Sequence, residues 1–216
     1  MIGSGPGGYT AAFRAADLGI SVILIEKNTT LGGVCLNRGC IPSKAYLHLS
    51  NVIEEAKKSK DMGISFTKPN INIEKIKNWK DNIVSNLSSG ISSLANKRNV
   101  NIINGKASFQ SADKLIVIDK QKKNIIIQFE YCIIATGSSP AAMKNIDLKH
   151  PNIINSTKAL SLDKIPNKML IIGGGYIGLE LGTVYESFGT KITVANEIPI
   201  KVIKTNIFFI IFILLN

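Results

Sequence analysis

The sequence is poor in the residues that build disulfide scaffolds and metal sites. Its 216 residues contain only three cysteines and two histidines, which are too few for a secreted disulfide framework and lack the second ligand pair of a tetrahedral metal site. No basic-then-apolar signal segment opens the chain, which predicts a cytoplasmic protein in which any disulfide is catalytic. The apolar run Ile207–Leu215 has nine residues, whereas a membrane-spanning helix needs about 18–20. We therefore expect no membrane span.

Arginine is also scarce. Lysine and arginine total 26 against 15 acidic residues, a net charge of +11, yet only three of the 26 are arginines. Bidentate contacts to phosphates and bases favour arginine. Lysine, isoleucine and asparagine (23, 36 and 20 residues) are abundant together along the whole chain, which indicates a bias in the coding sequence. We therefore predict no nucleic-acid partner for an otherwise ordinary globular composition.

What the sequence does contain is an internal repeat with an offset of 170 residues. A G-x-G-x-x-G motif occurs at Gly3–Gly8 and again at Gly173–Gly178, and a further glycine, Gly19 or Gly189, follows eleven residues later. A helical pattern precedes each of these later glycines and a strand-like run follows it. Two such units in register predict an α/β protein with a Rossmann-like dinucleotide-binding domain and the start of a second one.

Each motif has the composition of a dinucleotide turn. The first glycine permits a tight turn, the second lets the backbone approach a pyrophosphate, and the third brings the helix close to the strand. An acid about 20 residues further on binds ribose hydroxyls. That acid is Glu26 in the first unit, while the same offset falls on Asn196, followed by Glu197, in the second. We therefore expect the first unit to bind its dinucleotide more readily.

Two cysteines, Cys35 and Cys40, follow Glu26 closely. Five residues of regular helix rise by about 7.5 Å, beyond the roughly 4.4–6.8 Å between the Cα atoms of bridged cysteines. A bridge therefore requires a distorted turn, for which Gly39 and Pro42 provide the means. A disulfide held in such a turn is easily reduced, so the pattern favours a redox-active pair.

The segment Leu31–Lys44, L-G-G-V-C-L-N-R-G-C-I-P-S-K, closely resembles the flavin disulfide oxidoreductases, which are pyridine nucleotide-disulfide oxidoreductases. The resemblance includes both glycine motifs and Tyr131–Ser138. Leu36, Ile41 and Ser43 match the members of the family that act on dihydrolipoamide. Members that act on glutathione or mercuric ions usually have valine at the first two of these positions.

The resemblance implies a role for each matching residue. The first motif and Glu26 hold the pyrophosphate and adenosine ribose of FAD. Cys40 lies against the flavin ring and carries the charge-transfer thiolate, Cys35 exchanges with the dithiol substrate, and Lys44 lies near flavin N5. The second motif holds NAD, with Glu180 towards the nicotinamide. The implied catalytic residues are Cys35 and Cys40, and the implied cofactor-binding residues are Gly3, Ser4, Gly5, Gly8, Glu26, Lys27, Gly33, Lys44, Ala107 (at the adenine), Thr136, Gly137, Ser138, Gly173, Gly175, Tyr176, Ile177, Gly178 and Glu180.

The implied activity is oxidation of protein-bound dihydrolipoamide, with electrons passing from the dithiol through the cysteine pair and FAD to NAD⁺. The implied partners are lipoyl domains of 2-oxo acid dehydrogenase complexes or of the glycine cleavage system. Members of the family are homodimers whose interface domain supplies a histidine–glutamate base. Neither His48 nor His150 corresponds to that histidine, so we expect this chain alone to turn over dihydrolipoamide slowly.

The expected domains are an FAD-binding domain with the redox-active disulfide, a partial NAD-binding domain and an apolar tail outside the family pattern, at residues 1–140, 141–197 and 198–216. Only Met1 and Ile2 precede the first motif, so we expect a shortened opening strand. We expect helices over Tyr46–Lys60 and Ile73–Leu94. We expect the run Ile207–Leu215 to have no interface domain to cover it and to be an aggregation hazard, because it combines high β-propensity with no charge.

Other conspicuous residues have ordinary structural explanations. Cys132 lies in an apolar strand and is expected to be an inert buried thiol. His48 and His150 are expected to be structural or exposed, and Trp79 belongs to the apolar stripe of its helix.

Three hypotheses stay open at this stage. The chain is a dihydrolipoamide-oxidising enzyme, or it is a fragment that binds flavin without chemistry, or it is a remnant that does not fold. A related alternative is a flavin disulfide reductase that acts on glutathione or mercuric ions. Flavin content and activity with dihydrolipoamide distinguish them.

Overall fold

The structure, a computed structural model, describes residues 1–140, 149–195 and 211–215. These residues form two compact units, Met1–Cys40 with Ile83–Ser138 and Ile41–Asn82 with Ser139–Asn216. The domain bounds expected from the sequence assign residues 41–82 to the first domain. In the structure this segment belongs to the second unit, because its apolar side chains pack into the core of that unit.

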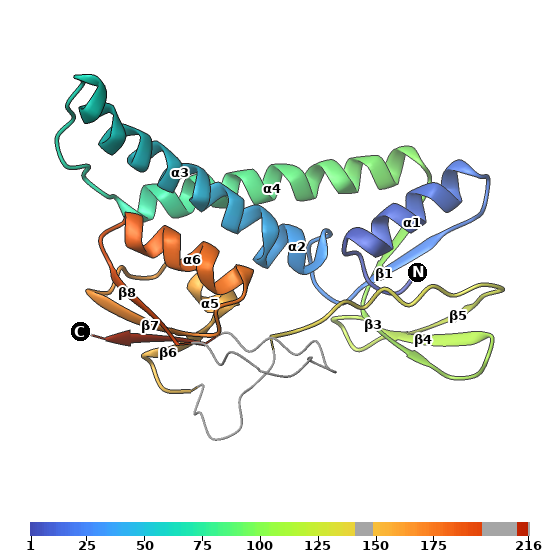
Figure 1. The fold of residues 1–216 in the computed structure, drawn as a ribbon. Coiled ribbons are helices and arrows are strands. Elements are labelled where there is room, and N and C mark those ends of the chain that lie inside the picture. The colour runs from blue at the N-terminus through green and yellow to red at the C-terminus, as the bar shows by residue number, and fades with distance from the viewer. Residues whose placement is uncertain (141–148, 196–210, 216) are drawn as a thin grey trace, which may run out of the picture. The chain divides into compact units, whose positions relative to one another are not determined.

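The first unit contains a parallel arrangement of strands (Figure 1). Strand β1 (Ile23–Glu26) pairs in parallel with β2 (Asn101–Asn104). On the other side of β1, Ile2 forms parallel bridges to both Ile25 and Ile134. The short opening segment therefore pairs with backbone on both sides.

Two helices and a second sheet complete the first unit. Helix α1 spans Pro6–Asp17 and α2 spans Gly33–Arg38. Strands β3 (Lys106–Phe109), β4 (Lys114–Ile118) and β5 (Asn124–Gln128) form an antiparallel sheet in the order β3-β4-β5. One face of this sheet joins Ile25 in an apolar cluster whose other buried members are Leu115, Val117 and Ile127.

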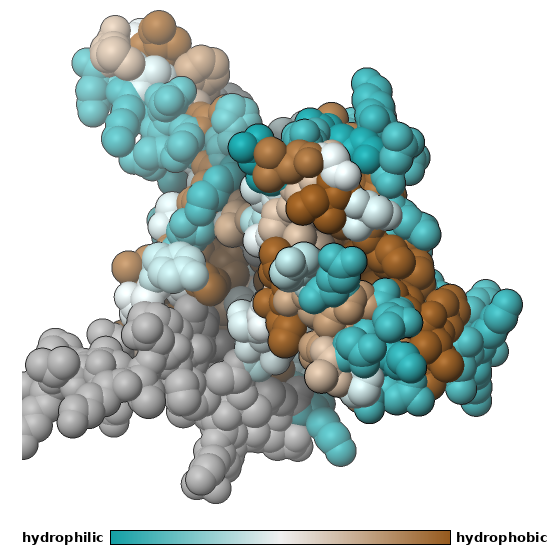
Figure 2. All heavy atoms as spheres, turned by 90° about the vertical axis from the view of Figure 1, so that its right-hand side faces the viewer, coloured by the Kyte–Doolittle hydropathy of each residue, from teal (hydrophilic) through white to brown (hydrophobic). Residues whose placement is uncertain are grey.

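Large apolar side chains also reach the surface of the first unit. Phe109, Ile126 and Tyr131 are 51%, 63% and 84% exposed. In Figure 2, brown apolar spheres lie interspersed with teal hydrophilic ones. Apolar side chains interspersed with hydrophilic ones in this way are ordinary on a protein surface.

The second unit is built on a four-stranded mixed sheet in the order β6-β9-β7-β8. Its strands are β6 (Ile153–Asn155), β7 (Lys168–Ile172), β8 (Lys191–Ala195) and β9 (Ile211–Leu215). Strands β7 and β8 are parallel, and β9 is antiparallel to both β6 and β7. Helices α5 (Ser156–Ala159) and α6 (Tyr176–Ser187) pack with this sheet around a buried core.

Two longer helices, α3 (Cys40–Lys58) and α4 (Ile73–Lys97), follow α2, and the short helix η1 (Ser59–Met62) lies between them. The helices expected over 46–60 and 73–94 are thus confirmed. The expected apolar stripe of α4 is only partly buried: Ile91 is 7% exposed, while Leu87 and Leu94 are 44% and 43% exposed. In the described part of the chain, no helix is long and apolar enough to cross a membrane.

The internal repeat is a structural repeat, which confirms the α/β fold class. Helices α1 and α6 both have 12 residues and begin 170 positions apart. Each ends just before a glycine in the left-handed region, Gly19 at φ 84° and Gly189 at φ 108°. Each is then followed by a parallel strand, β1 or β8. In the second unit the positions expected for the ribose acid, Asn196 and Glu197, lie outside the described residues.

The apolar tail differs from the expectation. The backbone of β9 pairs on both sides, with β6 and with β7, and the Phe212 side chain is 0% exposed. The expectation that the tail lies uncovered is therefore wrong for Phe212. A nine-residue apolar run shows no alternation, so the sequence does not reveal which neighbours it pairs with.

We predict that Phe212→Ala destabilises the second unit by about 3–5 kcal/mol, because it removes a large buried side chain from the core. The control Phe212→Leu keeps most of the apolar volume and is expected to cost less than about 1.5 kcal/mol. The only tryptophan, Trp79, lies in the second unit and reports its unfolding through fluorescence in urea. Equal stability of Phe212→Ala and the unmodified chain would contradict the observed packing of β9.

Candidate cofactor and redox site

The first glycine motif forms a turn that only glycine fits. Gly3 has φ +99°, and a Cβ on it would lie less than 3.0 Å from Ala135 O. A Cβ on Gly8 would in turn overlap Gly3 O. Helix α1 starts at Pro6, and the amide of Tyr9 donates to Gly5 O at 3.0 Å. The amides before Tyr9 therefore form the start of the helix, where anions such as phosphate bind.

Glu26 lies at the end of β1 and is only 4% exposed. Its Oε2 accepts hydrogen bonds from Ser4 N (3.0 Å) and Ser4 Oγ (2.6 Å). Its Oε1 accepts from Asn28 N (2.8 Å) and Asn28 Nδ2 (2.7 Å). Burial raises the pKa of Glu26, but the hydrogen bonds from Ser4 and Asn28 together outweigh burial and lower that pKa below its ordinary value. The carboxylate is thus held ionised beside the turn.

The cysteine segment starts directly on this turn. The amide of Gly32 donates to Ser4 O at 2.9 Å. Gly33 has φ +61°, and a Cβ on it would lie 2.5 Å from Gly5 Cα. Because of this close approach, helix α2, which carries Cys35, begins against the backbone of the glycine motif.

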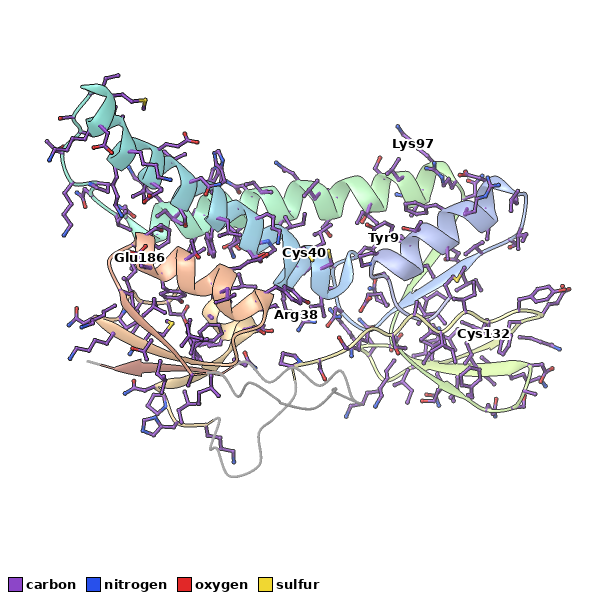
Figure 3. All side chains as sticks on the ribbon, viewed as in Figure 1. Tyr9, Arg38, Cys40, Lys97, Cys132 and Glu186 are labelled. Carbon is purple, nitrogen blue, oxygen red and sulfur yellow. The ribbon has the colours of Figure 1, made fainter. Side chains whose placement is uncertain are left out.

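The two cysteines stand on different helices. Cys35 is half-buried on α2, which ends at Arg38. Cys40 is exposed at the first position of α3 (Figure 3). Gly39 has φ −148° and ψ −111°, far from helical values. The backbone at Gly39 is thus distorted in the way that a bridge between Cys35 and Cys40 requires.

Other residues of the implied FAD site occupy the same unit. The Cα of Thr136 lies 3.2 Å from the Cβ position of Gly3, so the segment Thr136–Ser138 leaves the sheet beside the turn. Ala107 pairs with Val117 in the β3–β4 sheet and packs in the cluster around Ile25. Lys27 is exposed next to Glu26.

The second glycine motif has the same geometry in the second unit. Gly173 has φ +107°, and a Cβ on Gly178 would overlap Gly173 O. Helix α6 begins one residue after Gly175, with Tyr176 exposed and Ile177 half-buried. The amide of Gly173 donates to Ala195 O at 2.9 Å, which ties the turn to the end of β8.

One ion pair in the second unit joins Lys44, which the resemblance placed near the flavin, to Glu180, which it placed towards the nicotinamide. Lys44 Nζ donates to Glu180 Oε1 at 2.6 Å. Lys44 stands on α3 and Glu180 on α6, 136 positions away in sequence. The sequence offers no signal for this ion pair, because neither helix pattern states which faces meet.

Sequence reasoning missed Asn28. A polar residue two positions after the acid at the end of a strand is ordinary turn composition, and nothing in the pattern links it to the carboxylate. Among the residues left out of the site, Cys132 is half-buried beside the apolar cluster, and His150 Nδ1 accepts from Asn152 N at 3.2 Å. Within the described ranges, no group of three metal-ligating residues is present.

Comparison with known proteins identifies the class. Residues 1–204 match the family described as pyridine nucleotide-disulphide oxidoreductase. The chain belongs to this family, which confirms the resemblance that its redox segment and glycine motifs indicated.

Several similar proteins within the family share one name. The chain is 48% identical over 197 residues to dihydrolipoyl dehydrogenase of Buchnera aphidicola subsp. Schizaphis graminum, an alignment covering 91% of this chain and 41% of that protein. The dihydrolipoyl dehydrogenases of Vibrio parahaemolyticus and Bacillus subtilis are 48% and 44% identical over 194 residues, 90% of this chain and 41% of theirs. The chain thus spans about two fifths of the length of these relatives, and β9 lies beyond the family match.

We predict that Ser4→Ala raises the pKa of Glu26, because it removes one of the donors that offset burial. A carboxyl whose pKa is lowered on folding adds stability above its ordinary pKa of 4.5, and that stability is lost as the pH falls through the folded-state pKa. Ser4→Ala is therefore expected to lose less stability on acidification below about pH 4.5 than the unmodified chain.

Carbon-13 NMR titration of the Glu26 carboxyl and urea denaturation between about pH 3 and 7 measure both effects. The matched control is Ser108→Ala, an exposed serine of the same unit. An unchanged Glu26 pKa in Ser4→Ala would show that the hydroxyl does not stabilise the carboxylate.

Proposed function

We propose that this chain carries the FAD-binding and redox half of a dihydrolipoyl dehydrogenase. The observation that carries the proposal is the packing of the Cys35 helix on the glycine turn beside Glu26 within one unit. The identity of 44–51% with dihydrolipoyl dehydrogenases over about nine tenths of the chain supports the same substrate class.

The residues present suit FAD. The start of α1 suits a pyrophosphate, because only glycine fits at Gly3 and Gly8 and the backbone there is open to close approach. The ionised Glu26 suits the ribose hydroxyls of the adenosine half. When bound, FAD takes an electron pair from the reduced cysteines and passes it as hydride to NAD⁺.

The cysteine pair carries the exchange with the substrate. A thiolate of dihydrolipoamide attacks Cys35 Sγ, the Cys35–Cys40 bond breaks, and Cys40 leaves as a thiolate. The second substrate thiol, deprotonated, attacks the mixed disulfide and releases Cys35. Lipoamide leaves as a cyclic disulfide, and the two electrons it lost remain on the two cysteines.

The second unit is the proposed NAD-binding unit. The start of α6, at the turn that Gly173 and Gly178 form, suits the pyrophosphate. The Lys44–Glu180 ion pair holds a lysine on α3 against the first turns of α6, which is the side of the turn on which a nicotinamide is proposed. FAD is expected to bind more tightly than NAD⁺, because the first unit retains its acid.

The proposed partners and location follow from the same substrate class. The lipoyl domains of 2-oxo acid dehydrogenase complexes or of the glycine cleavage system present dihydrolipoamide, and the proposed location is the cytoplasm. The alternative is a flavin-binding fragment that does no chemistry.

We predict that the purified chain binds FAD with a stoichiometry near one, and that Glu26→Gln weakens binding about 10- to 100-fold by removing charge-assisted hydrogen bonds to the ribose. Flavin fluorescence titration measures the affinity, with Glu130→Gln, an exposed glutamate of the first unit, as control. Binding of NAD⁺ in the absence of any affinity for FAD would contradict the proposal.

We predict that dihydrolipoamide reduces a disulfide between Cys35 and Cys40, and that glutathione at equal thiol concentration does so more slowly. Differential alkylation followed by peptide mapping identifies the reduced cysteines, and Cys132→Ser is the control that leaves this pair intact. A bridge that includes Cys132, or equal rates with both thiols, would argue against the proposed substrate class.

A further inference from the structure

The carboxylate of Glu26 has no spare acceptor position. A carboxylate offers about four lone-pair sites, and the chain itself supplies four donors, two on each oxygen. The side chain is also only 4% exposed. A ribose hydroxyl that is to donate to Glu26 must therefore replace a protein donor.

The four donors differ in how readily they leave. Two are backbone amides, and the Ser4 hydroxyl belongs to a residue that is 0% exposed. The fourth donor is the side-chain amide of Asn28, a residue that is only half-buried. Rotation about its side-chain bonds releases this amide to water without moving the backbone.

The backbone of Asn28 is separately fixed. Asn104 Nδ2 donates to Asn28 O at 2.8 Å, and the amide of Asn28 donates to Glu26 Oε1. The first bond ties the main chain just after β1 to the last residue of β2, and the second ties it to the last residue of β1. The mobile element at the carboxylate is thus one side chain rather than a loop.

We infer that the Asn28 side-chain amide occupies the position on Glu26 Oε1 that a ribose hydroxyl of the cofactor takes, so that Asn28 is an internal competitor displaced on binding. The inference rests on the proposed FAD site and deepens it. The exchange is a replacement of one N–H donor by one O–H donor on the same oxygen, with no change of charge.

A competitor and a support have opposite effects when removed. If FAD displaces the Asn28 amide, then in Asn28→Ala a water molecule donates to Glu26 Oε1 instead. Water is displaced from this oxygen more easily than a tethered amide. FAD then binds about 3- to 10-fold more tightly, the size expected for one hydrogen bond. The gain lies in faster association, while dissociation is unchanged because Asn28 does not donate to Glu26 in the complex.

The test is stopped-flow and equilibrium titration of FAD by flavin fluorescence with the unmodified chain, Asn28→Ala and Asn101→Ala. Asn101 is an exposed asparagine on β2 and serves as the matched control. NMR of the Asn28 side-chain amide gives a second readout, since its resonances move towards those of a hydrated amide when FAD is added.

Faster association and tighter binding for Asn28→Ala alone support the inference. Weaker binding, or faster dissociation, shows that Asn28 supports Glu26 in the complex and overturns it. Unchanged affinity together with an unmoved Asn28 amide signal also overturns it. Failure of every variant, the unmodified chain included, to bind FAD overturns the proposed function as well, and this result is distinguishable from the others.

Discussion

The contact between the third glycine of each motif and the carbonyl of the first is the constraint on which both units depend. A side chain at Gly8 or Gly178 would overlap the carbonyl oxygen of Gly3 or Gly173. Only a hydrogen at this position lets the helix start so close to the strand. The same approach brings the helix N-terminus to the carboxyl end of the parallel strands, which is where ligands bind in open α/β sheets. The fold and the proposed binding site therefore both depend on this contact between glycine and carbonyl.

The sequence predicted the elements whose causes are local. The two glycine turns follow from backbone sterics, α4 follows from a long apolar period, and the break at Gly39 follows from the spacing of two cysteines. Elements set by tertiary surroundings were not predictable. Strand β6 and helix α5 were not predicted, and the pairing of Lys44 with Glu180 depends on which helix faces meet. The bond from Asn28 to Glu26 belongs to the same class, because a turn asparagine has the same pattern whether it binds water or a carboxylate.

The tail shows how tertiary surroundings decide a structure. Strand β7 buries Met169 and Ile171 almost completely, so it needs backbone partners on both edges. Strand β8 supplies one edge in parallel. The other edge is met by β9, which runs antiparallel and lies beyond the residues that match the family. Of the side chains on β9, Phe212 lies in the core of this unit and is 0% exposed.

Ser4, in the first glycine motif, bonds to Glu26 through two of its groups and to the cysteine segment through a third. Its amide and hydroxyl donate to Glu26, and its carbonyl accepts from the amide of Gly32. Beside it, Gly33 approaches Gly5 so closely that a methyl group would not fit. The position of the cysteine helix is therefore set by backbone contacts to the same turn at which we propose that the pyrophosphate binds. Because those contacts are made by backbone atoms, the start of the Cys35 helix is held against the glycine turn without any long side chain.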